Sequence, residues 1–174
     1  MTELFGLRHP EARRQGRALL AMALKQTRGM ERMPELSLSE RGKPWFPACP
    51  EIQFNWSHSG ELLLCALSDR PVGVDIEVVR PRREELFLRC LTEKEQNWCD
   101  SGGDRWHRFY LLWTRRESAC KRTGRGLSMP VWEIAVPLPP EERLGGLIFR
   151  SYEEEGWVAA LCGEGPMPEE IHWL

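Results

Sequence analysis

The chain has 174 residues, a formal net charge of −2, 41% hydrophobic residues and 29% charged residues. These values predict a single compact unit over residues 1–174, and they give no overall electrostatic signal for nucleic acid or an anionic membrane. The six cysteines are scattered without a Cys-x-x-Cys pair, which favours structural thiols in a reducing compartment over a zinc site or a disulfide framework. Because the sequence shows neither a signal-peptide core nor an apolar run of membrane-spanning length, we expect a cytoplasmic protein.

The first part of the chain predicts one helix followed by strands. Pro10 is expected at the first helical position, and a helical stripe follows at Leu19, Leu20, Ala23 and Leu24. The runs IQFNWS, ELLLCALS and VGVDIEVV predict three strands, with a turn at SHSG between the first two. We expect these three strands to form an antiparallel meander.

The second part begins after a break at Pro81. The run LTEKEQNWCD predicts a helix, because Thr92 and Glu95 have the spacing of a capping box. A longer helix is predicted for RWHRFYLLWTRRESACKRTG, closed by Gly124 and Gly126. The runs VWEIAV, GLIFRSY and WVAALC predict strands. The fold class is therefore α+β.

Two acids lie on one face of the VGVDIEVV strand. Alternation places Val72, Val74, Ile76 and Val78 toward the core, and Asp75 and Glu77 on the opposite face with Gly73. Carboxylates two residues apart on a strand are about 7 Å apart. They repel each other unless a cation lies between them, and hard oxygen ligands suit Mg²⁺ bound to phosphate. The alternative is an ordinary solvated strand face.

The long helix offers a third carboxylate and a lysine. Trp113, Glu117 and Lys121 have the spacing i, i+4, i+8 and so share one stripe. Glu117 completes a three-carboxylate metal site in this interpretation, and Lys121 reaches a phosphate on the metal. The alternative is a helical salt bridge between the two.

Other polar residues have functional and structural interpretations that the sequence leaves open. Ser57, His58 and Ser59 bind a phosphate or form a plain polar turn. Arg17, Arg41 and Lys43 add positive charge to a site or to a solvated surface. Glu95 closes the capping box or accepts a proton in a cleft.

The order of the motifs RGKP, FNWSHSG, VGVDIE, LTEKE and WTRRESACKRTGRGL resembles the 4′-phosphopantetheinyl transferase superfamily, in its larger single-chain type. The resemblance runs from about Arg17 to Leu127. It implies a monomeric pseudo-twofold pair of similar α+β halves, residues 1–79 and 80–174, with the active site between them. It also implies a reaction of the holo-[acyl-carrier-protein] synthase type. Coenzyme A binds with Mg²⁺, or alternatively Mn²⁺, on its pyrophosphate, and its 4′-phosphopantetheine arm moves to a serine of an apo acyl, peptidyl or aryl carrier protein, releasing adenosine 3′,5′-bisphosphate.

The resemblance also implies roles for individual residues. Asp75, Glu77 and Glu117 match the metal-binding acids, and Lys121 matches the lysine that binds the pyrophosphate and assists catalysis. Glu117 or Glu95 accepts the serine proton. The residues expected to hold the remainder of coenzyme A are Arg17, Arg41, Lys43, Ser57 and His58.

Two departures from the family pattern and two rival functions accompany this interpretation. Arg116-Glu117 stands where the family has Lys-Glu, and the region before the first helix is short. Either Arg8, His9, Arg13 and Arg14 replace the upstream basic residues of the family, or coenzyme A binding is weaker. Arginine clusters at residues 80–89 and on the long helix predict an acidic carrier as partner. The alternatives are a metal-dependent phosphodiesterase or nuclease, and a non-catalytic module that binds coenzyme A or a carrier protein. Neither nucleic acid nor a membrane is expected as partner.

Overall fold

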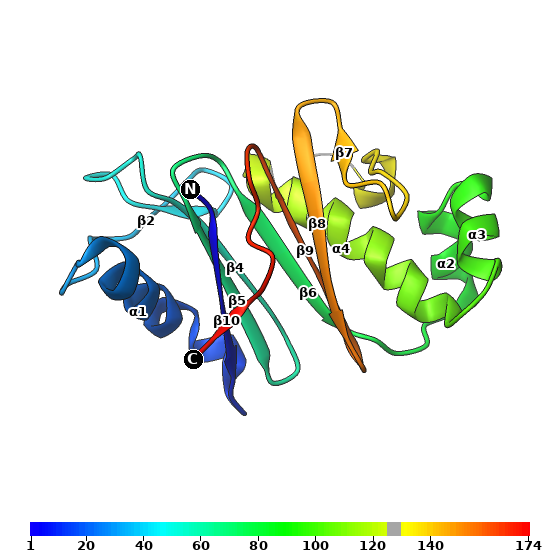
Figure 1. Cartoon of the computed structure of the whole chain (residues 1–174), viewed down its shortest axis with the longest axis horizontal. Helices are drawn as coiled ribbons and strands as arrows, with labels where there is room; N and C mark the ends of the chain where they lie inside the picture. Colours follow the sequence, from blue (N-terminus) through cyan, green and yellow to red (C-terminus); the bar gives the residue numbers. More distant parts are fainter. Residues whose placement is uncertain (125–129) are drawn as a thin grey trace.

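The computed structural model describes residues 1–124 and 130–174, which contain two four-stranded sheets and four α-helices. Figure 1 shows the two sheets at the centre, with α1 at one side and the other helices at the opposite side. The first sheet has the order β10-β1-β5-β4, with bounds His172–Trp173, Glu3–Arg8, Leu62–Ser68 and Gln53–Ser59. The second has the order β6-β9-β8-β7, with bounds Gly73–Val78, Trp157–Gly163, Leu147–Glu154 and Arg143–Leu144. A small hairpin joins β2 (Ser37–Leu38) to β3 (Pro44–Trp45). The mixed composition confirms the α+β class.

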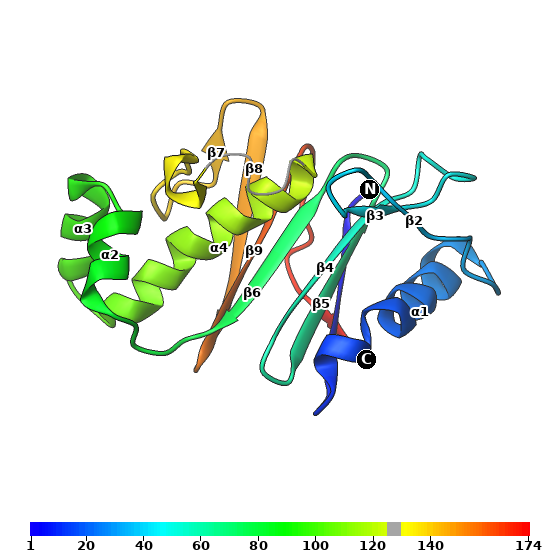
Figure 2. The same cartoon turned by 180° about the vertical axis from the view of Figure 1, so that it is seen from behind.

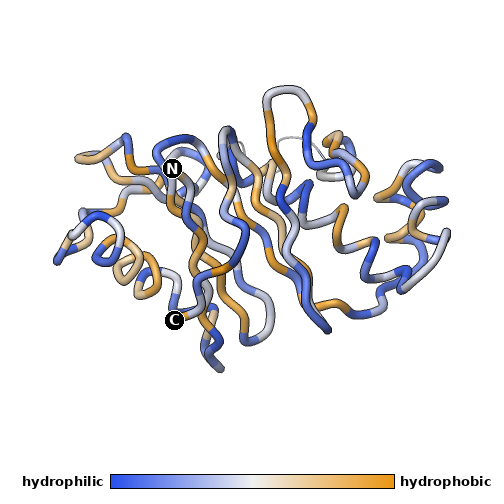
Figure 3. The backbone as a smooth tube through the Cα atoms, in the orientation of Figure 1, coloured by the Kyte–Doolittle hydropathy of each residue, from blue (hydrophilic) through white to orange (hydrophobic). Residues whose placement is uncertain are grey.

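The apolar faces of the two sheets pack against each other. Leu62, Leu64 and Ala66 of β5 form one core cluster with Val74 and Ile76 of β6 and with side chains of β8 and β9. Burying a side chain such as isoleucine or leucine stabilises the fold by about 1.5–3 kcal/mol. Figure 3 shows hydrophobic residues gathered along these central strands. Because the apolar side of β6 faces this core, its other side is turned toward the outer helices.

Helix α1 (Gly16–Arg28) covers the outer face of the first sheet. Its predicted stripe is confirmed, since Leu19, Leu20, Ala23 and Leu24 have no exposed surface. The predicted start at Pro10 is wrong. Strand β1 stays paired with β5 through Arg8, and a 3₁₀ turn at Ala12–Arg14 comes before the helix.

The turn expected at Ser57-His58-Ser59 is wrong, because all three residues belong to β4 and pair with β5. The chain turns instead at Gly60 and Glu61, between the paired residues Ser59 and Leu62. Two-residue hairpin loops require positive φ, and Gly60 has φ 57°. The whole polar stretch therefore lies on a strand.

The expected three-strand meander is also wrong in its third member. Strand β6 does not pair with β5 and instead begins the second sheet as the antiparallel partner of β9, with Asp75 opposite Ala160. The partner strand lies far along the chain, beyond any local pattern. Strand β6 lies next to β4, and side chains connect the two.

The helices of the second part follow the prediction closely. Helix α3 (Glu93–Asp100) has the predicted capping box, with Thr92 as its N-cap. Helix α4 (Arg105–Thr123) ends at Gly124, which has φ 63°, and it crosses the outer face of β6 and β9 (Figure 2). Gly126 and the end of the last motif, residues 125–127, lie outside the described residues. Helix α2 (Glu84–Cys90) was not predicted.

The predicted strands are confirmed at β8 and β9, but the one expected for VWEIAV is wrong. Residues Val131–Glu133 form a 3₁₀ turn. The carbonyl groups of this region bind arginines of α4: Arg116 donates to Ile134, and Arg115 donates to Pro137 and Glu141. Arginine side chains thus take the place of a neighbouring strand.

The six cysteines all carry free thiols. In the part of the chain that the structure describes, no helix combines the length and the apolar character needed to cross a membrane.

Candidate active site

Side chains of β4 join the two sheets along the free edge of β6. Asn55 accepts a hydrogen bond from the amide of Val74 through Oδ1, at 2.9 Å. Ser59 accepts one from the amide of Val78 through Oγ, at 3.1 Å. Unpaired amides on a strand edge need acceptors. Here alternate side chains of β4 supply them, and we call this set of contacts the β4–β6 seam.

The middle of the seam holds a buried charge network. Asp75 Oδ1 accepts hydrogen bonds from Lys121 Nζ at 2.6 Å and from Ser57 Oγ at 2.9 Å, and Lys121 Nζ also donates to Ser57 Oγ at 2.8 Å. Asp75 is only 3% exposed, which excludes the solvated strand face. Its second oxygen, Oδ2, is buried without a hydrogen-bond partner. The network therefore leaves one buried carboxylate oxygen, Asp75 Oδ2, without a hydrogen-bond donor.

Gly73 brings helix α4 close enough to β6 for this network to form. A Cβ atom at Gly73 would lie 2.0 Å from the Ser118 carbonyl oxygen and 2.4 Å from the Arg122 amide nitrogen. Only glycine permits this approach. As a result, Glu117 and Lys121 of α4 lie over the polar side of β6.

The predicted acids and the lysine line one cavity with a volume of about 410 Å³. Its walls come from β4, β6 and α4: Trp56, Ser57, His58, Asp75, Glu77, Trp113, Glu117 and Lys121. The structure thus brings together six residues that the sequence marked separately. They are Ser57, His58, Asp75, Glu77, Glu117 and Lys121.

The electrostatics of this cavity favour a cation. Burial raises the pKa of Asp75, although the neighbouring Lys121 opposes the change. Burial also raises the pKa values of Glu77 and Glu117, and the charge of Asp75 raises both further. Carboxylates that repel one another in a shared site are stabilised by a bound cation.

The carboxylates fit a hard divalent ion in their chemistry. Three carboxylates that could coordinate an ion, those of Asp75, Glu77 and Glu117, line one cavity. Asp75 Oδ2 has no hydrogen-bond partner, so it is available as a metal ligand. Within residues 1–124 and 130–174, however, no three His, Cys, Asp or Glu side chains are gathered closely enough to hold a metal ion. Lys121 is the cation that contacts Asp75 in this structure.

Two smaller cavities continue from the first toward α1. One of 170 Å³ shares Glu117 and Lys121 with it and adds Arg41 and Lys43. Another of 260 Å³ adds Arg17 at the start of α1. The shared lining residues make one groove with an acidic end and a basic end. A ligand with several phosphates matches such an arrangement.

His58 lies on the exposed side of the acidic end. Partial burial, together with the charges of Arg13 and Lys121, lowers the pKa of His58 below its ordinary value. Its imidazole is therefore neutral near pH 7. A bound anion would favour the protonated form.

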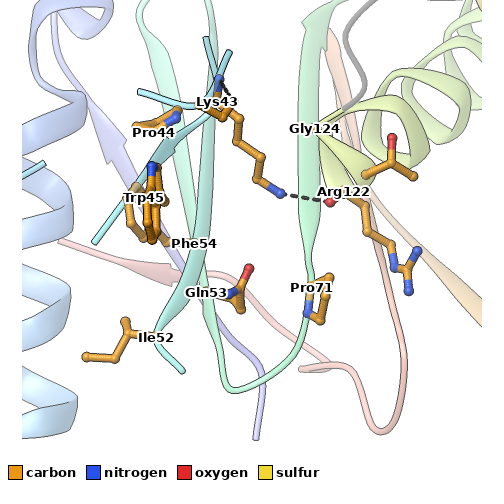
Figure 4. Close-up of a pocket in the computed structure, with 11 residues that line it drawn as sticks. Lys43, Pro44, Trp45, Ile52, Gln53, Phe54, Pro71, Arg122 and Gly124 are labelled. Atoms are coloured by element: carbon orange, nitrogen blue, oxygen red, sulfur yellow. Dashed lines mark hydrogen bonds between the residues drawn. The ribbon is translucent and has the colours of Figure 1, made fainter. Parts of the chain in front are cut away.

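Lys43 lies directly before β3, and its side chain reaches the end of α4. Its Nζ donates a hydrogen bond of 2.8 Å to the Arg122 carbonyl oxygen, as Figure 4 shows. Burial, with the charge of Arg122, lowers the pKa of Lys43 to about 8. The contact suits the carbonyl end of a helix dipole. Lys43 also lines a further cavity of 390 Å³, walled in part by Trp45 and Pro71.

Glu95 does not line the groove. Its Oε2 accepts hydrogen bonds from Thr92, and its Oε1 accepts one of 2.5 Å from the buried Arg116. Burial alone would raise the pKa of Glu95, but the Arg116 hydrogen bond brings it below its ordinary value. The structure therefore assigns Glu95 the capping box and a buried ion pair.

The sequence prediction overlooked Asn55, and it placed Ser59 in a turn, either as part of a phosphate site or as a plain polar residue. Both lie on the same side of β4 as Ser57, and all three contact β6. The alternation Asn-x-Ser-x-Ser is the available signal, and it was obscured by the turn predicted at the last two positions.

Comparisons with known proteins agree with this geometry. The family model described as the 4'-phosphopantetheinyl transferase superfamily matches residues 71–162, a range that contains β6 and α4 and exceeds half of the chain. The 4'-phosphopantetheinyl transferase Sfp of Bacillus subtilis is 32% identical over 147 residues, which cover 78% of this chain and 66% of that relative. The 4'-phosphopantetheinyl transferase AcpT of Salmonella typhimurium is 37% identical over 129 residues, covering 71% and 64%. The chain spans just under two thirds of the length of these curated relatives. Its matched range and the acids and lysine within it lead to one conclusion: the chain belongs to the 4'-phosphopantetheinyl transferase superfamily.

Proposed function

We propose that this protein transfers the 4′-phosphopantetheine arm of coenzyme A to a serine of an apo carrier protein, with release of adenosine 3′,5′-bisphosphate. The observation that carries the proposal is the buried network of Asp75, Ser57 and Lys121, which shares a cavity with Glu77 and Glu117. The names of the relatives, all 4'-phosphopantetheinyl transferases, support it. The halves at residues 1–79 and 80–174 form one monomeric unit in this proposal, related by a pseudo-twofold axis.

The acidic end of the groove is proposed to hold the pyrophosphate together with a metal ion. Asp75, Glu77 and Glu117 would bind Mg²⁺, or alternatively Mn²⁺. When bound, the ion neutralises phosphoryl oxygens and acts as a Lewis acid. Lys121, in the last turn of α4, supplies a second positive charge, and its ammonium group contacts Asp75 and Ser57. Fixed positive charge of this kind stabilises the charge that develops during phosphoryl transfer.

The basic end of the groove is proposed to hold the adenosine end of coenzyme A. Arg17 and Arg41 lie in the two cavities that continue from the acidic end, and Lys43 lies beside Arg41. Ser57 and His58 stand where the cavities meet the acids. A 3′-phosphate is the natural partner for paired guanidinium groups.

The transfer step needs a group that accepts the proton of the carrier serine. In the proposed step the serine oxygen attacks the β-phosphorus, the bond to the leaving adenosine 3′,5′-bisphosphate breaks, and the proton passes to a carboxylate. Glu117 is the better candidate because it lines the cavity and its pKa is raised by burial. Glu95 has both oxygens occupied elsewhere.

The carrier is proposed to be acidic and to approach the exposed arginines near α2. Arg80 and Arg83 are exposed in the segment that follows β6. Arg82 and Arg89 are also exposed, although Arg82 donates to the Tyr110 hydroxyl and Arg89 stacks over Trp132. Exposed positive charge accelerates encounters with an acidic partner. A cytoplasmic location is proposed on the support of the six free thiols.

A transfer assay tests the proposal. The protein is incubated with coenzyme A, Mg²⁺ and a panel of apo acyl, peptidyl and aryl carrier proteins, and the carrier mass is measured. We expect a gain of one phosphopantetheine arm with wild type, loss of the gain with Asp75→Ala, and retention with Asp69→Ala. Asp69 is the matched control, because it is an exposed aspartate outside the groove. No gain on any carrier would refute the proposal.

A further inference from the structure

We propose that Ser59 is a positioning residue that restrains the Glu77 side chain on the groove side of β6, where Glu77 would bind the divalent ion. The inference rests on the proposed function, because it assigns Ser59 a task at the same acidic end of the groove. Ser59 is not among the residues that line the cavity, so it acts through Glu77 and not on a substrate.

The hydrogen bonds of Ser59 fix the direction of its single proton. Its Oγ accepts the amide of Val78 at 3.1 Å and lies 2.9 Å from Glu77 Oε2, to which it donates. A serine hydroxyl has one proton and accepts through its lone pairs. Because the backbone amide occupies the acceptor side, the proton points to the carboxylate.

The contact repeats the one that holds the neighbouring acid. Ser57 donates to Asp75 at 2.9 Å, and Ser59 donates to Glu77 at 2.9 Å, so the two pairs keep the same register along β4 and β6. Asp75 has Lys121 as a further partner. Glu77 is half-buried near the end of β6, and it carries one more rotatable bond than aspartate.

Restricting that side chain has a chemical benefit. A ligating carboxylate that is already held by a hydrogen bond loses less side-chain entropy when an ion binds. Groups that orient metal ligands typically change metal affinity by about 10–100-fold when they are removed. We therefore assign Ser59 to the lower end of this range, about tenfold, because it makes a single hydrogen bond to Glu77.

The experiment measures Mn²⁺ binding by calorimetry, without coenzyme A or carrier. We expect Ser59→Ala to weaken Mn²⁺ binding about tenfold, and Ser59→Thr, which keeps the hydroxyl, to stay within about twofold of wild type. Ser68→Ala is the matched control. Its hydroxyl likewise contacts a side chain, Thr2, and a backbone amide, that of Arg70, but it lies outside the groove. We expect it to leave Mn²⁺ affinity unchanged.

A second background separates positioning from a general effect on the seam. In Glu77→Gln protein, Ser59→Ala is expected to cause no further loss of Mn²⁺ affinity, because the two changes act through one carboxylate. If Ser59→Ala fails to fold, Ser59→Cys, with a weaker donor of similar size, is expected to weaken Mn²⁺ binding less than tenfold but measurably. Equal Mn²⁺ affinity of wild type and the folded Ser59 variants would overturn the inference, while transfer by wild type would keep the proposed function intact. Absence of Mn²⁺ binding by wild type would overturn the inference together with the proposed metal site.

Discussion

Replacing Gly73 with alanine should separate β6 from helix α4 and disable the groove. The added Cβ would lie 2.0 Å from the Ser118 carbonyl oxygen, whereas real Cβ atoms essentially never come closer than 3.0 Å to a neighbour. The difference is 1.0 Å, and the obstructing atom belongs to a helix backbone, so α4 must move by at least that amount. No flexible side chain can absorb the clash.

The size of the effect follows from that displacement. Overpacking a core typically costs about 1–3 kcal/mol, and a clash with two backbone atoms places Gly73→Ala at about 3 kcal/mol. For a chain of this length, the midpoint of thermal unfolding should fall by about 6–12 °C. Because Glu117 and Lys121 move with α4, a displacement of about 1 Å should also lower the transfer rate about 100-fold.

The assay compares Gly73→Ala with Gly163→Ala in thermal unfolding and in transfer to an apo carrier. Gly163 is a strand glycine of the same sheet, but a Cβ there would come closer than 3.0 Å only to the end of the Met167 side chain, at 2.9 Å. That side chain can rotate away, so Gly163→Ala should cost less than about 1 kcal/mol. If Gly73→Ala matched wild type in both unfolding and transfer, the reasoning that α4 rests on this glycine would be refuted.

Three further predictions concern charged side chains. Lys121→Met removes the ammonium group that lies 2.6 Å from the buried Asp75. The affinity for coenzyme A, measured by calorimetry, should therefore fall about tenfold or more. An unchanged affinity would exclude Lys121 from coenzyme A binding. Glu95→Gln breaks a buried ion pair with Arg116, so the free energy of unfolding measured in urea should fall by about 3 kcal/mol. The folded variant should still transfer the phosphopantetheine arm. Loss of this transfer in folded protein would instead make Glu95 a proton acceptor. Burial and a neighbouring guanidinium lower the pKa of Lys43 to about 8, whereas the unfolded chain keeps this proton up to about pH 10.4. Between these pH values the unfolded state therefore binds more protons than the folded state, so the free energy of unfolding rises with pH. Lys43→Met should remove that rise, as measured by urea titrations at about pH 7.5 and 9.5. A difference in the free energy of unfolding between wild type and Lys43→Met that stays the same at both pH values would contradict this prediction.

Elements with strong local patterns could be predicted from the sequence. The apolar stripe of α1, the capping box of α3 and the glycine that ends α4 depend on residues within a few turns of one another. The same holds for the acids, since Asp75 and Glu77 share a strand face and Glu117 and Lys121 share a helix stripe. Local spacing was enough to place these four residues in pairs.

Non-local pairing explains what the sequence did not predict. Strand β6 pairs with β9, whose residues lie 79 to 89 positions further along the chain, so no nearby pattern reveals that β6 leaves the first sheet. The carbonyls of Ile134, Pro137 and Glu141 are bound by arginines of α4, an element that lies earlier in the chain. Glu95 illustrates the same limit within the site, because its two interpretations differ only in the distant partner, Arg116, that occupies it.

The β4–β6 seam connects the architecture to the proposed chemistry. Had β4 paired with β6 through its backbone, the two strands would lie about 4.8 Å apart and no room would remain between them. Asn55 and Ser59 instead satisfy the β6 amides at side-chain length, which keeps the strands further apart. The hydroxyls that take part in this spacing also contact the carboxylates of Asp75 and Glu77. A substitution in the seam should therefore affect the stability of the sheet junction and the orientation of the acids together, and only the metal-binding readout separates the two effects.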